Sequence, residues 1–160
     1  MVIALVVCGA AFFILKLLFP SDTVRIRKLM TRLERAASVA PGESQLVSLG
    51  RVQTLRELFA AECQVVVDAH DYGKLEFLGR DELLQAVSAA IALRQSIHVK
   101  FAETSIRVGE SKTNAAVEVA AVIRTGQRRG ETLVLLKVLV KKRESDWLIT
   151  RVESIRSLQM

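Results

Sequence analysis

The chain has 160 residues, of which 51% are hydrophobic, which excludes an intrinsically disordered protein and fits one folded domain with a single core. The formal net charge of +6 is concentrated in residues 16–35, and only 5% of residues are aromatic, so the composition disfavours nucleic-acid binding. Two cysteines without a CxxC spacing and two histidines predict neither a metal site nor a cofactor.

An unbroken apolar run occupies residues 2–15, and Lys16 and a second short apolar stretch follow it. Because Lys16 can extend its amine to one membrane surface, residues 1–20 reach the lower limit for a spanning helix. A secretory signal peptide is the alternative, but no basic side chain precedes the run and the residues after it make a poor cleavage site. We therefore expect residues 1–20 to be a retained transmembrane anchor.

A basic amphipathic juxtamembrane helix is predicted over residues 21–41, where Ile26, Leu29 and Leu33 recur at helical spacing. Its basic side chains can face anionic lipid headgroups, at about 1 kcal/mol each. The residues expected at the membrane surface are Arg25, Arg27, Lys28, Arg32 and Arg35. Because they follow the apolar run and none precedes it, the positive-inside rule predicts a single-pass protein of the cell inner membrane with its soluble domain in the cytoplasm.

Residues 42–160 are expected to form one α+β domain, which begins with two further helices around a short pair of strands. Ser44 offers an N-cap for a helix that ends near Phe59, and Asp81 offers one for a helix that ends near Leu93. Between these helices, the β-branched residues 63–68 predict a strand, and residues 75–78 predict a shorter one after a turn.

From Ser96 to its end the chain alternates apolar and polar residues, which predicts strands joined by turns. Three helices followed by a meander of antiparallel strands, with one strand inserted early, indicate an α+β architecture. Trp147, the only tryptophan, opens the last strand and is expected to be a buried packing anchor. The expected strands lie at residues 97–101, 117–123, 133–142 and 147–155.

This order of elements resembles the nuclear-transport-factor-2-like (NTF2-like) superfamily, which includes ketosteroid isomerase and the SnoaL-like polyketide cyclases. The resemblance is carried by residues 55–68, a helix running directly into a strand, by residues 75–84, a turn into a helix, and by the closing strand 146–153. It implies a cone in which about three helices pack on a curled antiparallel sheet and enclose a pocket. This scaffold hosts enzymes, ligand carriers and assembly modules, so the fold does not select a function.

Asp68 falls where the resemblance implies a general base, at the end of the first strand. The isomerase pairs its aspartate base with an oxyanion hole of tyrosine and protonated aspartate. Here the helix after Ser44 has no tyrosine and residues 133–138 contain no acid, so a base would lack its electrophilic partner. Asp68 is therefore either a structural, turn-capping carboxylate or a catalytic base, and His70 and His98 are expected to be exposed strand or turn residues.

Three charged residues inside predicted strands form a second candidate site. Glu118, Lys137 and Glu153 lie abreast if the hairpins pair residue 118 with 137 and residue 137 with 153. Opposite charges across strands contribute only about 0.2–1 kcal/mol. The three residues are therefore either a solvent-facing ladder or a binding patch through which the sheet face docks a second copy or a membrane protein complex.

These observations favour a membrane-tethered, non-catalytic binding or assembly module of the NTF2-like fold, with the lipid bilayer as one partner. The alternative is a small-molecule enzyme or carrier of the isomerase or cyclase type, in which Asp68 acts as general base on a small apolar ligand in the cone pocket. A structural membrane protein with an undefined partner is the third hypothesis.

Overall fold

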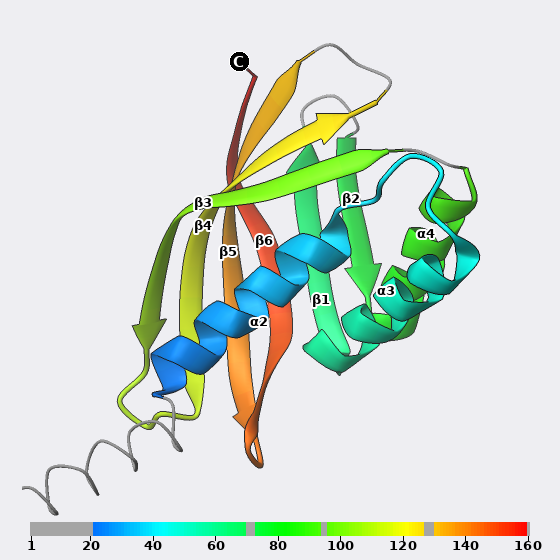
Figure 1. Ribbon diagram of the computed structural model, residues 1–160. Helices are drawn as coiled ribbons and strands as arrows, with labels where there is room; N and C mark the ends of the chain where they lie inside the picture. Colours follow the sequence, from blue (N-terminus) through cyan, green and yellow to red (C-terminus); the bar gives the residue numbers. More distant parts are fainter. Residues whose placement is uncertain (1–20, 70–72, 94–95, 127–129, 160) are drawn as a thin grey trace, which may run out of the picture.

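The computed structural model describes residues 21–69, 73–93, 96–126 and 130–159, which form an α+β fold. Within these residues, three helices cover one face of a six-stranded sheet and leave the other face uncovered by helices (Figure 1). The helices are α2 (Asp22–Ala37), α3 (Gln45–Leu58) and α4 (Arg80–Ala92). The strands are β1 (Phe59–Ala69), β2 (Gly73–Leu78), β3 (Ile97–Val108), β4 (Asn114–Thr125), β5 (Glu131–Arg143) and β6 (Asp146–Gln159).

The sheet is mixed, with the strand order β2-β1-β6-β5-β4-β3. The last strand, β6, lies between β5 and β1, antiparallel to β5 and parallel to β1. The predicted antiparallel sheet is therefore wrong at this one pair, while the other neighbours run antiparallel. Alternation of apolar and polar residues reports which face of a strand is buried but not which strand lies beside it.

Strand β3 bends, and the bend wraps the sheet around α2 (Figure 1). The β3–β4 register shifts between Ala102 and Ser105, and Glu103 has a positive φ of 50°. The first half of β3 is fastened to the end of α2, where the backbone N–H of Val99 donates to Ser38 Oγ at 3.0 Å. The bulge and this bond accompany the curl of the sheet around α2.

Helix starts agree with the sequence at Ser44 but not at Asp81. Ser44 is the N-cap of α3, and its side chain accepts a hydrogen bond from the backbone N–H of Val47 at 3.4 Å. Helix α4 instead has Gly79 as its N-cap, without a side-chain bond, and Asp81 lies in its first turn. Gly79 takes a φ of 102°, which a glycine adopts without strain, and Asp81 still complements the positive end of the helix dipole.

Helix α2 supplies one side of the domain's core. The predicted helical stripe is confirmed, because Ile26, Leu29 and Leu33 are all buried and belong to the same cluster as Val117 and Val138 of the sheet. We expected residues 21–41 to be a juxtamembrane segment outside a domain at 42–160, but α2 shares the core of that domain. The apolar stripe faces the sheet because an uncovered sheet face and an amphipathic helix bury each other.

The predicted membrane anchor, residues 1–20, lies outside the described residues. Within the described part of the chain, no helix combines the length and the apolarity that crossing a membrane requires.

Candidate functional site

Asp68 lies on the face of the sheet that the helices do not cover, which we call the outer face. Val65 and Val67 pack in or against the core, so Asp68, one residue further along β1, points to the opposite side. Its side chain is exposed, and its strand partner is Lys74 of β2. Asp68 does not line the groove described below. This placement turns Asp68 away from the helices.

Of the two histidines, His98 is the one that the structure describes. His98 is exposed on β3 opposite Arg124, as expected, and His70 lies outside the described residues. Among the residues that the structure describes, no group of three or more His, Cys, Asp or Glu side chains could hold a metal ion.

The pairing that would set Glu118, Lys137 and Glu153 abreast is present. Glu118 of β4 pairs with Lys137 of β5, and Lys137 pairs with Glu153 of β6. Lys137 Nζ lies 4.0 Å from Glu153 Oε1, and all three side chains are partly exposed. They alternate with core residues such as Val117 and Val138, so they lie on the outer face.

Two arginines that the sequence analysis did not select extend this set. Arg151 Nε lies 2.9 Å from Glu153 Oε2, and Arg107 of β3 forms an ion pair with Glu118. We call the five side chains the charged row; their charges alternate in the order Arg107, Glu118, Lys137, Glu153, Arg151. Arg151 could have been found because it lies two residues before Glu153 on the same strand face. The face of the sheet on which Arg107 lies depends on the bulge in β3, so alternation along the strand does not identify Arg107 in the same way.

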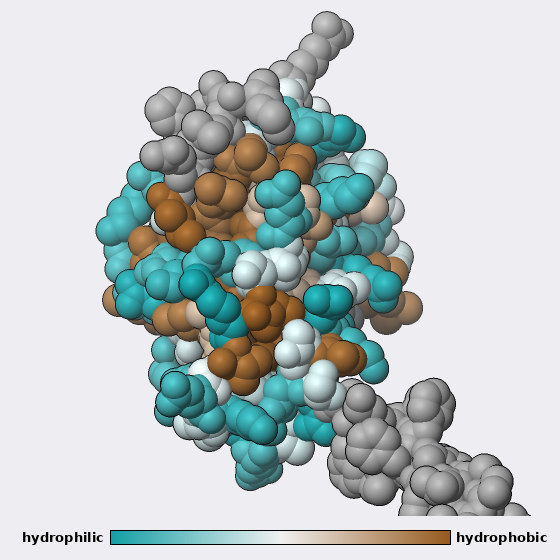
Figure 2. Space-filling model, turned by 90° about the vertical axis from the view of Figure 1, so that its left-hand side faces the viewer, coloured by the Kyte–Doolittle hydropathy of each residue, from teal (hydrophilic) through white to brown (hydrophobic). Residues whose placement is uncertain are grey.

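Apolar side chains flank the charged row on the same face. Residues two positions apart along a strand share a face of the sheet. The residues two positions from Glu118 on β4 and from Lys137 on β5 therefore also lie on the outer face, and the strand pairing sets them beside one another. Figure 2 views the molecule from the β3 side and shows hydrophobic patches exposed among hydrophilic side chains. The paired apolar neighbours of the row are Ala116 with Leu139, Ala120 with Leu135, and Val122 with Leu133.

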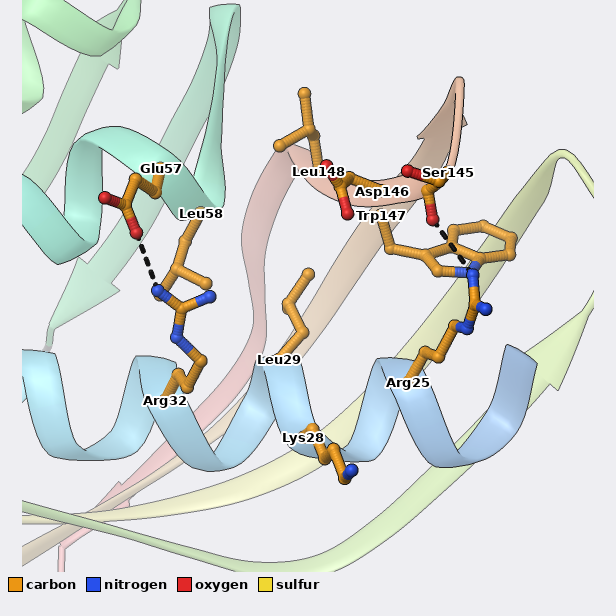
Figure 3. A pocket seen from close by; sticks show the side chains of 10 residues that line it. All are labelled: Arg25, Lys28, Leu29, Arg32, Glu57, Leu58, Ser145, Asp146, Trp147 and Leu148. Atoms are coloured by element: carbon orange, nitrogen blue, oxygen red, sulfur yellow. Dashed lines mark hydrogen bonds and ion pairs between the residues drawn. The ribbon is translucent and has the colours of Figure 1, made fainter. Parts of the chain in front are cut away.

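The five basic residues expected at a membrane surface divide into two groups. Arg25, Lys28 and Arg32 line a groove of about 700 Å³ between α2, the end of α3 and the start of β6 (Figure 3). Arg27 and Arg35 are exposed and do not line this groove. Helical spacing puts Arg27 on another face of α2, whereas Arg35, three residues after Arg32, lines a separate cavity.

Comparison with known proteins shows the fold. No family model and no curated sequence matches the chain. A solved structure of a conserved protein from Planctomyces limnophilus is 17% identical, with a TM-score of 0.65, over 87% of this chain and 98% of that one. An NTF2-like protein from Cytophaga hutchinsonii is 12% identical, with a TM-score of 0.61, over 84% of this chain and 97% of that one.

A third similar structure is a putative scytalone dehydratase from Novosphingobium aromaticivorans. It is 17% identical, with a TM-score of 0.59, over 87% of this chain and 87% of the other. At this identity the likeness establishes the NTF2-like, cystatin-like fold alone, because one scaffold of this kind carries many functions.

Proposed function

We propose that this protein is a membrane-tethered, non-catalytic binding module that assembles with a second copy through the outer face of its sheet. The observation that carries the proposal is the charged row with apolar side chains on both sides of it. The row lies on a face that no described helix covers.

The composition of this face supports an interface. An antiparallel sheet with one face in water usually alternates apolar and polar residues, with the polar ones outward. Here Leu133, Leu135 and Leu139 occupy outer-face positions on β5 and are only partly buried. Partly exposed leucines grouped on one face are characteristic of protein–protein contacts.

The alternating charges support a second copy as the partner. A two-fold interface places the same patch of both subunits face to face, so the patch must complement itself. A row in which positive and negative side chains alternate can do so, because a small offset puts each charge of one row opposite an unlike charge of the other. Such charges select the partner and its register more than they add affinity.

Sedimentation of the full chain in detergent tests this assembly. We expect the wild type to sediment as a dimer and Lys137→Glu to sediment as a monomer, because the reversed charge puts three acids in adjacent positions of the row. Lys112→Glu makes the same charge change in the exposed β3–β4 turn and should stay dimeric. A monomeric wild type, or a dimeric Lys137→Glu, would contradict the proposal.

The tether is supported by the apolar residues 2–15 and the poor cleavage site after them. Expressed in a bacterium, the full chain should stay with the membranes after alkaline carbonate extraction. Recovery of a soluble protein that has lost about 20 N-terminal residues would identify a signal peptide instead.

The cytoplasmic orientation is supported by the basic residues that follow the apolar run. A phosphatase fused to the C-terminus should be inactive, as expected in the cytoplasm. Adding arginines after Met1 and neutralising Arg27 and Lys28 should invert the protein. Arg25 is left unchanged in this test because its guanidinium donates to the carbonyl of Ser145. An active phosphatase on the unmodified chain would refute the orientation.

A further inference from the structure

The groove between α2 and the start of β6 is a second candidate site, separate from the charged row and from Asp68 (Figure 3). Its volume of about 700 Å³ lies in the range of small-molecule sites. None of its lining residues belongs to the charged row.

The inner side of the groove is apolar and rigid. Leu29 of α2 and Leu58 of α3 are 6% and 2% exposed, and Trp147 is 5% exposed. The indole is held in place because its Nε1 donates to Asp22 Oδ1 at 3.2 Å. These side chains are held by the core, so a bound apolar group would meet a preformed surface.

The rim of the groove is cationic. Arg25, Lys28 and Arg32 lie three and four residues apart on α2, with Leu29 between them. Arg25 donates to the Ser145 carbonyl, a neutral acceptor, at 3.1 Å. Among the described residues, neither Arg25 nor Lys28 has a carboxylate within ion-pair distance.

Two acids also line the groove. Glu57 is already paired, because its Oε2 lies 2.8 Å from Arg32 Nη2, and this hydrogen bond lowers the pKa of the Glu57 carboxyl. Asp146 is exposed and lies opposite Arg143 in the β5–β6 register. Glu57 neutralises Arg32, and the Lys28 side chain points away from the other lining side chains (Figure 3), so Arg25 is the cation that the groove offers to an anion.

Bonds close the groove at both ends. The Arg32–Glu57 pair joins α2 to α3, and the Arg25–Ser145 bond joins α2 to the β5–β6 turn (Figure 3). Seven residues of helix separate the two arginines, a rise of about 10.5 Å. A groove closed at both ends on this scale fits a small molecule rather than an extended chain that has to pass through it.

We infer that this groove binds a small amphipathic carboxylate, with its apolar body against Leu29, Leu58 and Trp147 and its carboxylate on Arg25. A guanidinium offers five N–H donors in a planar fork, so Arg25 can bind a carboxylate while it keeps its bond to Ser145. Lys28 adds positive potential at the margin. The inference does not depend on assembly through the charged row.

Trp147 is the only tryptophan, so its fluorescence reports on the groove directly. The full chain in zwitterionic detergent is titrated with sodium hexanoate, and a saturable fluorescence change is expected. Arg25→Gln should weaken binding by about tenfold or more, because it removes a charged hydrogen bond. The matched control is Arg27→Gln, which removes the same charge from the exposed side of α2 and should change binding by less than about twofold.

Two further ligands define the chemical class. Acetate should not bind because it lacks the apolar body, and 1-hexanol should bind more weakly than hexanoate because it lacks the charge. Circular dichroism checks that Arg25→Gln is folded, and the comparison of hexanoate with 1-hexanol on the wild type decides if it is not. Absence of saturation with hexanoate, equal binding of hexanol, or equal losses in Arg25→Gln and Arg27→Gln would each overturn the inference.

Discussion

Asp22 joins the first turn of α2 to the hairpin of β5 and β6. Its Oδ1 accepts from Lys142 Nζ at 2.9 Å and from Trp147 Nε1 at 3.2 Å. Lys142 Nζ also lies 5.8 Å from the centre of the Trp147 ring, within the range of a cation–π interaction. A single carboxylate therefore positions both an ammonium group and the ring that borders the groove.

Replacing Trp147 by alanine should destabilise the domain by about 3–5 kcal/mol, the range for truncation of a large buried aromatic. The ring is 5% exposed, so its removal leaves a cavity that the surrounding leucines cannot fill. Urea unfolding of the chain from Ser21 onward, followed by circular dichroism, measures the change. Asp68→Asn is the control, because its exposed carboxylate should contribute little. An unfolding midpoint equal to the wild type would show that the ring is not a packing anchor.

Asp22 should make stability depend on acidic pH. The hydrogen bond from Lys142 is the largest influence on its carboxyl, and it holds the pKa of Asp22 below the ordinary value of 3.8. Because the pKa of Asp22 is lower in the folded state than in the unfolded state, its ionised carboxylate stabilises the fold at pH values above the unfolded-state pKa. This stabilisation is lost as the pH falls below 3.8 and through the folded-state pKa. Unfolding free energies measured from pH 5 to about pH 2 should therefore fall less steeply for Asp22→Asn than for the wild type. Equal slopes would contradict this assignment.

At the scale of elements, the connection between α2 and α3 depends on one buried arginine. The Nη1 of Arg51, from α3, donates to the carbonyls of Arg35 and Ala36 at 2.9 and 3.2 Å and also to that of Ser38. Its Nη2 forms an ion pair with Glu43, and the two side chains are only 8% and 12% exposed. Arg51 thus caps the last turn of α2, whose carbonyls lack helical partners.

Arg51→Met should destabilise the domain by about 3–5 kcal/mol, because it leaves the Glu43 carboxylate and the helix carbonyls buried without partners. The loss should exceed that of Arg56→Met by several fold, because Arg56 is exposed on the same helix. Thermal unfolding of both variants measures the difference. Similar midpoints for the two would mean that Arg51 does not hold the helices together.

At the scale of the whole molecule, the two faces of the sheet have separate roles. The inner face packs on all three described helices through one continuous cluster that includes Val117, Val138 and Val152. The outer face carries the charged row. Cys63 is 1% exposed within the cluster, and burial raises the pKa of its thiol above the ordinary value of 9.0.

Cys63 should therefore report on global unfolding. In the Cys8→Ser variant at neutral pH, a thiol reagent should label the native protein very slowly, because reaction requires both exposure and the thiolate. Labelling should accelerate with urea in step with the loss of circular dichroism. Rapid labelling without denaturant would show that the core around Cys63 opens locally.

Several features of this protein could be determined from the sequence by itself. The order of helices and strands indicated an α+β fold and resembled the NTF2-like superfamily, and Glu118, Lys137 and Glu153 lie abreast, as one possible pairing of the predicted hairpins required. Trp147 was expected to be buried, and it is. These features follow from local periodicity: side chains alternate strictly along a strand, and helical residues repeat every third or fourth position.

Only the tertiary structure decided which surfaces meet. The run from Cys63 to Val67 is apolar at nearly every position, so its pattern does not tell which face Asp68 takes, and pairing with β2 and β6 places it outward. The parallel β1–β6 contact joins residues distant in the sequence, which alternation does not encode. The same amphipathic pattern allows a helix to bury its apolar stripe against either a bilayer or a sheet, so the pattern does not tell which of the two it meets. In this protein α2 packs on the sheet and brings Arg25 beside Trp147 (Figure 3), because the helix and the sheet each had an apolar surface to remove from water.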